Sequence, residues 1–211
     1  MYIIINLYMK KLNVAIIGGS FNPVTNGHLQ LGLFVSNIDF IDEVWYVPNY
    51  KSVFGKDLES WTDRIVMLQK AISYLYALSE HKVFRLSNIE AEYDLDGYTI
   101  TLSQKLKELH KNVNFYFAIG QDIANNIHKY KYYNKLIDEL NFIIIPRKGY
   151  TPSNEWYLND KHIYKKSDES LIEVSSSEVR KYIRTKEIWK LLTKIPLEVL
   201  DYIKINHLYK K

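Results

Sequence analysis

The sequence contains no cysteine among its 211 residues. This absence excludes disulfide bonds, thiolate zinc sites and a cysteine nucleophile, and it fits the reducing cytoplasm. A strong net charge is also absent, because the formal charge is only +4, which says little about an anionic partner. No apolar run approaches the length of a membrane span. With 47% hydrophobic and 25% charged residues, the composition is that of an ordinary globular protein. We expect a cytoplasmic protein that binds neither a membrane nor a nucleic acid.

The N-terminal segment Met1–Tyr8 is apolar, but no basic region precedes it and no small-residue cleavage site follows it. It is too short to cross a bilayer and does not resemble a secretory signal. Met9 is a second candidate start, directly before the first predicted strand. We predict that residues 1–11 form a dispensable extension, the alternative being an added edge strand, and the choice between Met1 and Met9 stays open.

Short β-branched apolar runs alternate with helical patterns along the chain. The predicted strands are Asn13–Ile17, Glu43–Pro48, Val83–Leu86, Asn114–Ile119, Phe142–Ile145 and, more weakly, His162–Tyr164. The predicted helices between them are Gly27–Ser36, Ser60–Leu78, Thr99–His110, Asp122–Ile127 and Tyr132–Leu140. This alternation predicts an α/β fold with a doubly wound parallel sheet covered on both faces. The carboxyl ends of the strands then meet at one edge, where ligands bind.

The pattern changes after Pro146. Turn formers and aromatic residues fill Gly149–Asn159, and helices are predicted at Ser175–Arg184 and Leu197–Ile205. There is no internal repeat and no low-complexity linker. We therefore predict one domain over residues 12–211, of which residues 168–211 form a small helical C-terminal part.

The most informative stretch runs from Val14 to Leu31. An apolar strand leads into Gly18-Gly19-Ser20-Phe21-Asn22-Pro23, and Thr25-Asn26-Gly27-His28 then opens an amphipathic helix. Exposed turn N–H groups beside a helix N-terminus favour a bound phosphate. The stretch is neither a Walker loop nor a dinucleotide fingerprint, because the required Gly-Lys-Ser/Thr and Gly-x-Gly-x-x-Gly spacings are missing. Taken alone, such a turn is often only a tight connection, and a single histidine is more often structural.

A second motif, near the C-terminus, makes the evidence for a phosphate-binding site more specific. Residues 18–28 resemble the nucleotidyltransferase signature Gly-Ser/Thr-Phe-Asp/Asn-Pro-x-His/Thr-x-Gly-His. Val174-Ser175-Ser176-Ser177-Glu178-Val179-Arg180 matches the distal Ile-Ser-Ser-Ser/Thr-x-x-Arg motif of the same superfamily, in the expected order. The resemblance implies a Rossmann-like sheet and transfer of a nucleotidyl group from ATP.

The middle of the chain resembles the nicotinate and nicotinamide mononucleotide adenylyltransferases within that superfamily. The matching segments are Lys56 with Arg64 and Met67, Tyr98-Thr99, Gly120-Gln121-Asp122, Pro146-Arg147-Lys148-Gly149, and Leu200–Tyr209. Together with the two motifs, the resemblance covers roughly residues 12–209. It implies that a mononucleotide 5′-phosphate attacks the α-phosphorus of ATP in NAD biosynthesis, with Mg²⁺ held by phosphates and water and no protein metal ligands.

The resemblance also implies the site residues. The expected ATP site consists of Gly18, Gly19, Ser20, Phe21, Gly27, His28, Ser176, Ser177 and Arg180. The expected mononucleotide site consists of Asn22, Lys56, Tyr98, Thr99, Asp122, Tyr130 and Arg147. The expected catalytic residues are His28 and Thr25, assigned to the α-phosphate, together with Lys56 and Arg180, assigned to the β- and γ-phosphates.

Three positions depart from the usual pattern. Thr25 replaces the first histidine of His-x-Gly-His, and Asn22 replaces the more frequent aspartate. Tyr130 stands where bacterial members usually carry a tryptophan that stacks on the pyridine ring. These departures leave the choice between nicotinate and nicotinamide mononucleotide open, although Tyr98-Thr99 favours the nicotinate form.

Two other interpretations remain open from the sequence. Phosphopantetheine adenylyltransferases also carry Thr-Asn-Gly-His, although the longer chain and the Gly-Gln-Asp segment here argue against them. A non-catalytic nucleotide- or RNA-binding module would account for the basic pI and the aromatic content, but it leaves the intact phosphate motifs unexplained. The sequence leaves open whether the chain forms a homo-oligomer.

Overall fold

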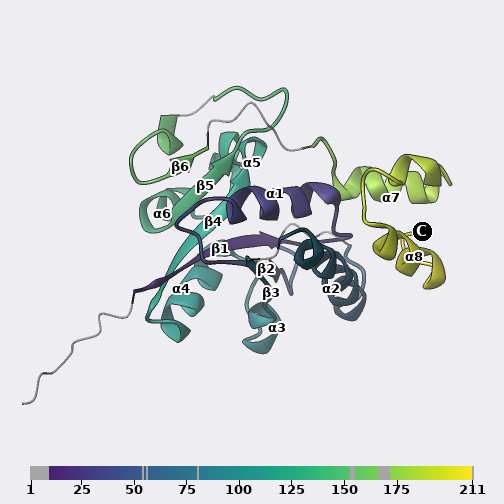
Figure 1. Cartoon of the computed structure of the whole chain (residues 1–211), viewed down its shortest axis with the longest axis horizontal. Helices are drawn as coiled ribbons and strands as arrows, with labels where there is room; N and C mark the ends of the chain where they lie inside the picture. Colours follow the sequence, from purple (N-terminus) through teal and green to yellow (C-terminus); the bar gives the residue numbers. More distant parts are fainter. Residues whose placement is uncertain are drawn as a thin grey trace, which may run out of the picture.

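A computed structural model describes residues 10–53, 55, 57–79, 81–152, 155–165 and 172–210. Its centre is a six-stranded sheet in the order β3-β2-β1-β4-β5-β6 (Figure 1). The strands are β1 (Leu12–Gly19), β2 (Glu43–Pro48), β3 (Val83–Leu86), β4 (Val113–Gly120), β5 (Asn141–Ile145) and β6 (Ile163–Tyr164). The helices are α1 (Asn26–Ser36), α2 (Trp61–Leu78), α3 (Ile89–Glu92), α4 (Thr99–Leu109), α5 (Gln121–Asn125), α6 (Tyr133–Glu139), α7 (Ser176–Arg184) and α8 (Leu197–Ile205). Three 3₁₀ turns are η1 (Ile127–Lys129), η2 (Glu155–Tyr157) and η3 (Ile188–Leu191).

Every strand pair is parallel, so the carboxyl ends of the strands share one edge. Gly19 at the end of β1 pairs with Pro48 of β2, and Gly120 at the end of β4 pairs with Ile145 of β5. The chain adds β2 and β3 on one side of β1, then returns to add β4 and β5 on the other side. The winding therefore reverses between β1 and β4, which is where doubly wound sheets bind ligands.

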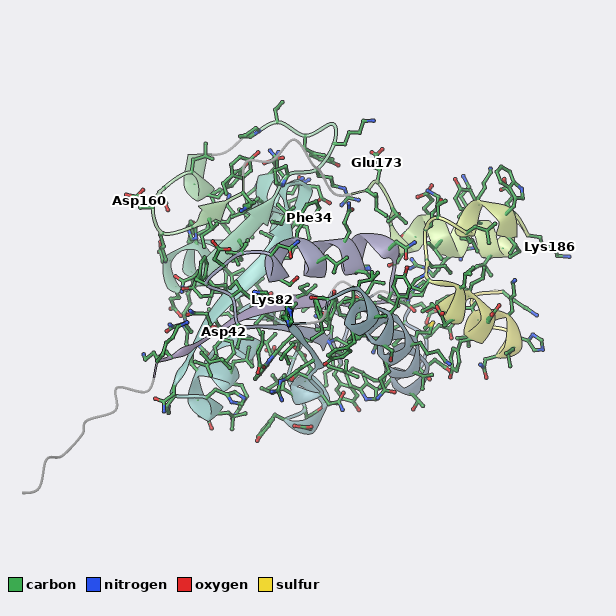
Figure 2. All side chains as sticks on the ribbon, in the orientation of Figure 1. Phe34, Asp42, Lys82, Asp160, Glu173 and Lys186 are labelled. Atoms are coloured by element: carbon green, nitrogen blue, oxygen red, sulfur yellow. The ribbon has the colours of Figure 1, made fainter. Side chains whose placement is uncertain are left out.

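At the opposite edge of the sheet, polar contacts join the loops that precede β1, β2 and β3. The Asn13 backbone N–H donates to Oδ2 of Asp42 over 2.8 Å, and Lys82 Nζ donates to the Ile41 carbonyl over 3.1 Å (Figure 2). These hydrogen bonds provide partners for backbone groups near the starts of β1, β2 and β3.

Alternating residues of β1 bury opposite faces of the sheet. Ala15 and Ile17 belong to a core shared with α1, α2, α7 and α8, while Val14 and Ile16 belong to a core shared with α4 and α6. Successive strand side chains point to opposite faces, so a central strand covered on both sides must be apolar throughout.

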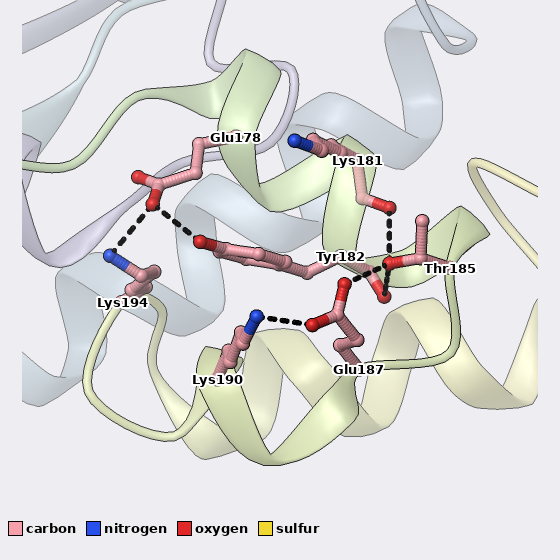
Figure 3. A network of polar contacts seen from close by, with 7 residues as sticks. All are labelled: Glu178, Lys181, Tyr182, Thr185, Glu187, Lys190 and Lys194. Carbon is pink, nitrogen blue, oxygen red and sulfur yellow. Dashed lines mark hydrogen bonds and ion pairs between the residues drawn. The ribbon is translucent and has the colours of Figure 1, made fainter.

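Helices α7 and α8 pack together at one end of the molecule, beside α1 and α2 (Figure 1). A polar network fixes α7 against the following turn (Figure 3). The Tyr182 hydroxyl donates to Glu178 Oε1 over 3.0 Å, and Lys194 Nζ lies 3.1 Å from the same oxygen. Lys190 pairs with Glu187 in the adjoining turn. The helix that carries the second motif is thereby held in one orientation.

The predicted fold class, an α/β Rossmann-like doubly wound parallel sheet, is confirmed. Helix α3 was not predicted, because four residues are too few to show a helical period. Asp122–Ile127 was predicted as one helix, but α5 ends at Asn125 and η1 follows. Residues 1–9 of the predicted extension lie outside the described residues, and the division at residue 12 stays a prediction. None of the described helices is long and apolar enough to cross a membrane.

Candidate active site

His28 lies in the first turn of α1, at the switch point of the sheet. The backbone N–H of Thr25 donates to Nδ1 of His28 over 3.0 Å, and the Thr25 hydroxyl lies 2.8 Å from the same nitrogen. Since Nδ1 accepts the backbone N–H, the proton of the neutral ring resides on Nε2. The edge of the Phe21 ring packs against the imidazole at a centroid distance of 5.0 Å. The ring is thus held as a hydrogen-bond donor.

The charge state of His28 follows from its surroundings. Burial, and then the positive charge of Arg147, lower the pKa of His28 to about 4. At neutral pH the ring is therefore uncharged, and its Nε2–H can donate to an anion without adding a full charge. A phosphate bound beside it would raise that pKa, because a negative charge favours the protonated ring.

The first turn of α1 is anchored from the strand beneath it. The buried Tyr46 hydroxyl of β2 donates to the His28 carbonyl over 3.1 Å. Gly32 leaves the room for this hydroxyl, since a Cβ at that position would lie 2.0 Å from it. Gly18 at the end of β1 is exposed, and a Cβ there would meet nothing within 4 Å. An open space therefore adjoins the central strand, beside a firmly held helix start.

A buried cation supports the glycine turn. The side chain of Arg64 is 2% exposed, and its Nη1 donates to the carbonyls of Ser20 (2.9 Å) and Asn49 (2.8 Å). Its Nε donates to the Glu59 carbonyl over 3.2 Å. Backbone dipoles thus satisfy the guanidinium, and its positive charge lies beneath the turn, where it favours an anion above.

The side chain of Asn22 holds the glycine turn in place through three hydrogen bonds. Its Oδ1 accepts from the Tyr209 hydroxyl over 2.9 Å and from the Glu59 backbone N–H over 3.1 Å. Its Nδ2 donates to the Asp57 carbonyl over 3.1 Å. Asn22 is 3% exposed. The side chain therefore joins the turn to two distant segments, and Asn22, unlike an aspartate, can supply the Nδ2 donor.

The second motif meets the first. Ser176 Oγ donates to the Pro23 carbonyl over 2.8 Å, and Arg180 Nη1 donates to the Asn22 carbonyl over 2.7 Å. Arg180 Nη2 also donates to Ser177 Oγ over 3.1 Å. A Cβ on Gly27 would lie 3.0 Å from Val174, so Gly27 permits this close contact. Residues far apart in sequence thus form one polar site, with the α7 N-terminus beside the glycine turn.

An ion pair joins the ends of β4 and β5 to the second motif. Arg147 Nη1 lies 2.7 Å from Asp122 Oδ2, and Nη2 donates to the Val174 carbonyl over 3.3 Å. Asp122 Oδ1 is buried and has no hydrogen-bond partner among the described residues. Arg147 therefore crosses the carboxyl edge of the sheet, close enough to influence the charge of His28.

The tyrosines expected at the pyridine ring lie around the start of α4. Tyr98 occupies the N-cap position of α4 and Thr99 is its first residue. The Tyr98 ring lies 5.8 Å from that of Tyr132, and Lys131 Nζ lies 4.8 Å from the Tyr98 ring centroid. Burial, and then the negative charge of Asp122, raise the pKa of Tyr130. Tyr98 and Tyr130 pack against the same core, and Tyr130 lies near the Asp122 carboxylate. Lys56 lies outside the described residues.

Sequence reasoning missed the residues that support the site from below. Tyr46 carried no signal beyond its aromatic character, and the only sign of Tyr209 was its place at the end of the family-like segment Leu200–Tyr209. The only sign of Arg64 was its place in the Arg-x-x-Met segment. These three residues hold backbone or side-chain atoms of the first motif, so their role is visible only from the packing.

The sheet order and the joined motifs define a nucleotide-binding α/β protein. Residues 16–182 match the family model described as "Cytidylyltransferase-like". A Bacillus pumilus protein named "Probable nicotinate-nucleotide adenylyltransferase" is 31% identical, covering 96% of this chain and 100% of its own length. A Bacillus mycoides protein of the same name is 32% identical with the same coverage.

Solved structures agree. A Plasmodium falciparum nicotinic acid mononucleotide adenylyltransferase complexed with NaAD superimposes with a TM-score of 0.80 and 28% identity, covering 94% of this chain and 97% of that one. The same enzyme complexed with APC gives a TM-score of 0.79 and 29% identity over the same shares. The chain belongs to the cytidylyltransferase-like family and, within it, to the nicotinate-nucleotide adenylyltransferases.

Proposed function

We propose that this chain joins nicotinate mononucleotide to the AMP moiety of ATP, releasing pyrophosphate and forming deamido-NAD in NAD biosynthesis. The observation that carries the proposal is the junction of the two motifs, in which Arg180 Nη1 lies 2.7 Å from the Asn22 carbonyl. That junction places a cation and a helix N-terminus beside the glycine turn and His28. The named relatives and the NaAD complex support the same reaction.

The reaction needs little proton chemistry. An oxygen of the mononucleotide 5′-phosphate forms a bond to the α-phosphorus of ATP, the bond from that phosphorus to the bridging oxygen breaks, and pyrophosphate leaves with the electron pair. Because the nucleophile is already an anion, no general base is required. Catalysis then depends on positioning and on stabilising charge at the α-phosphate.

His28 is assigned to that charge. Its Nε2–H is free to donate because Thr25 occupies Nδ1. As negative charge moves onto the α-phosphate oxygens in the transition state, this hydrogen bond strengthens. Thr25 supports the same region, and the exposed Gly18 and half-buried Gly19 allow the nucleotide to approach the backbone.

The leaving pyrophosphate is assigned to the second motif. Arg180, the hydroxyls of Ser176 and Ser177 and the N-terminus of the nine-residue helix α7 all favour an anion there. Lys56 is assigned to the same phosphates on the family resemblance alone. Arg180 donates to the Asn22 carbonyl and to Ser177 Oγ, which keeps its guanidinium near this position.

The acceptor is assigned to the other side of the switch point. Tyr98, Thr99 and Tyr130 would contact the pyridine ring, and Asp122 with Arg147 would contact the ribose and phosphate. Nicotinate is proposed because the named relatives act on the nicotinate nucleotide.

Mg²⁺ is proposed to enter with ATP, held by phosphate oxygens and water. Asp122 Oδ2 is paired with Arg147, while Asp122 Oδ1 has no hydrogen-bond partner among the described residues. No group of three or more metal-ligating side chains occurs among the described residues. The ion would neutralise phosphate charge.

The cytoplasm is proposed as the location of this protein, because the sequence lacks cysteine.

The test is a pyrophosphate-release assay with ATP, Mg²⁺ and one acceptor at a time. Nicotinate mononucleotide should give the highest kcat/KM and a product with the mass of deamido-NAD. A preference for nicotinamide mononucleotide would correct the acceptor alone. Turnover only with 4′-phosphopantetheine would overturn the proposal, and binding of ATP or RNA without pyrophosphate release would favour a non-catalytic module.

A further inference from the structure

Glu90 is a buried carboxylic acid that the proposed reaction does not use. It lies in α3, and its side chain is 2% exposed. The backbone N–H groups of Tyr50 and Gly97 lie near its carboxyl group and lower its pKa, against the effect of burial, and Oε2 has no hydrogen-bond partner among the described residues. Burying a carboxyl group without a directly bonded cation is costly, so this arrangement needs a reason.

The two donors belong to segments that lie against each other. One segment follows β2 and the other precedes α4. Asn49 Nδ2 donates to the Gly97 carbonyl over 3.1 Å, and Lys51 Nζ pairs with Asp94 over 2.8 Å. Gly97 has a φ of +82°, and a Cβ there would lie 2.6 Å from the Lys51 carbonyl. The two backbones are therefore in contact, and the N–H groups of both act on the Glu90 carboxyl group.

Both segments also reach the site. The Asn49 backbone N–H donates to the Gly19 carbonyl over 2.9 Å, at the glycine turn. Gly97 is followed directly by Tyr98 and Thr99, which begin α4. A shift of Gly97 relative to Asn49 would therefore move Tyr98 and Thr99 relative to the glycine turn.

We propose that Glu90 is a positioning residue for the mononucleotide acceptor. By accepting the N–H groups of Tyr50 and Gly97, it sets how far Tyr98 and Thr99 stand from the phosphate end of the site. Glu90 touches neither the nucleotide nor the reacting atoms in this account. The inference rests on the proposed function, because the acceptor is the mononucleotide assigned there.

The ionisation of Glu90 provides a second test of its role in binding the acceptor. Burial, with a smaller contribution from Asp96, raises the pKa of Glu90 to about 7, against the opposing effects of the two N–H groups and Lys51. Lys51, Asp94 and Asp96 are the charged groups that face it from the two segments. Ionised Glu90 adds a negative charge near a site for an anion, so acceptor binding should weaken as the pH rises through about 7.

The experiment compares Glu90→Ala, Glu90→Gln and the control Glu92→Ala, whose side chain is exposed on the same short helix. KM for nicotinate mononucleotide, KM for ATP and kcat are measured by pyrophosphate release at pH 6 to 8. Glu90→Ala should raise KM for the mononucleotide about tenfold and leave KM for ATP within twofold. Glu90→Gln should recover most of the loss, because its amide oxygen still accepts, and should lose the step near pH 7 that the wild type shows. Equal changes in both KM values, or no change in Glu90→Ala, would overturn the inference.

Amide hydrogen exchange keeps the two proposals separate. In Glu90→Gln and the wild type, Gly97 should exchange slowly, and in Glu90→Ala it should exchange at least tenfold faster. If the wild type released no pyrophosphate with any acceptor, the proposed function would fail, while the exchange rates would still report whether Glu90 holds Gly97. Equal Gly97 exchange in Glu90→Ala and the wild type would overturn the positioning role even in an active enzyme.

Discussion

Thr25 and His28 bond to each other at the start of α1, with the Thr25 backbone N–H 3.0 Å from the imidazole Nδ1. In an ordinary capping box, a glutamate or glutamine at this position would accept that N–H. Here the acceptor is an aromatic ring whose second nitrogen carries a proton. The cap of the helix therefore also fixes which nitrogen of His28 can donate to a ligand.

Replacing His28 tests this link directly. His28→Ala should lower kcat by about 10²–10³-fold, the loss typical of one oxyanion donor, or ~2.7–4 kcal/mol. The measurement is pyrophosphate release under saturating substrates, with circular dichroism to confirm the fold. His110→Ala is a matched control, because His110 ends α4 and packs on Trp45. A His28→Ala variant within a few-fold of wild-type kcat would contradict the role.

Arg180 should act mainly through ATP. Arg180→Ala removes a cation from the expected pyrophosphate position, and a hydrogen bond to a charged group contributes about 1.5–3 kcal/mol, or roughly 10- to 150-fold in affinity. KM for ATP should rise by that order, while KM for the mononucleotide changes little. Arg184→Ala, on the exposed side of the same helix, should leave both values unchanged. An equal effect of the two substitutions would argue against an ATP contact.

Two glycines should respond in opposite ways to an added methyl group. Gly32→Ala places a Cβ 2.0 Å from the Tyr46 hydroxyl, so it should destabilise the fold by about 1–3 kcal/mol although alanine favours helices. Gly18→Ala meets nothing within 4 Å and should unfold at nearly the wild-type temperature. Its methyl group occupies the open space at the end of β1, so ATP affinity should fall. Thermal unfolding and KM for ATP distinguish the two, and a stabilised Gly32→Ala would show that the hydroxyl can move.

Stability should fall on acidification because of His162. Burial, and then Lys161, lower the pKa of His162 from 6.5 to about 4. Between these values the unfolded chain binds a proton that the folded chain does not, so stability is lost as the pH falls, by up to about 3 kcal/mol. Glu90 acts in the opposite direction, because its raised pKa stabilises the folded state as the pH falls towards 4.5.

Comparison with a variant isolates the histidine. His162→Gln keeps an acceptor for the Phe142 N–H, which lies 3.4 Å from Nδ1, and cannot be protonated. Urea unfolding at pH 7.5 and pH 5 should therefore show a smaller loss of stability in His162→Gln than in the wild type. Equal losses in the two proteins would rule out His162 as the source.

Most of the fold could be predicted from the sequence, because strands buried on both faces, such as Glu43–Pro48, give a clear run of apolar residues. The first motif could also be predicted from the sequence, since strand, glycine turn and helix start follow one another within residues 14–28. Its contact with residues 174–180 could be expected only from the family pattern. No local signal states that Ser176 reaches the Pro23 carbonyl.

The residues that support the site, such as Arg64, could not be predicted from the sequence for a physical reason. An arginine on an amphipathic helix predicts a solvated face, yet Arg64 turns inward and is satisfied by three carbonyls. Those carbonyls belong to loops, and loop paths depend on tertiary packing rather than on residue type. The same holds for Glu90, whose donors are backbone N–H groups that any residue could provide.

The hydrogen bond from Tyr209 to Asn22 spans 187 residues of sequence. Contacts of such long range form late, because the chain between them must first be ordered. The glycine turn should therefore be among the last parts of the molecule to mature. Conversely, partial loosening of α8 would open the turn while the sheet remains intact. Loss of activity should then precede loss of strand signal on heating, so the turnover rate reports on how firmly the C-terminal helices are docked.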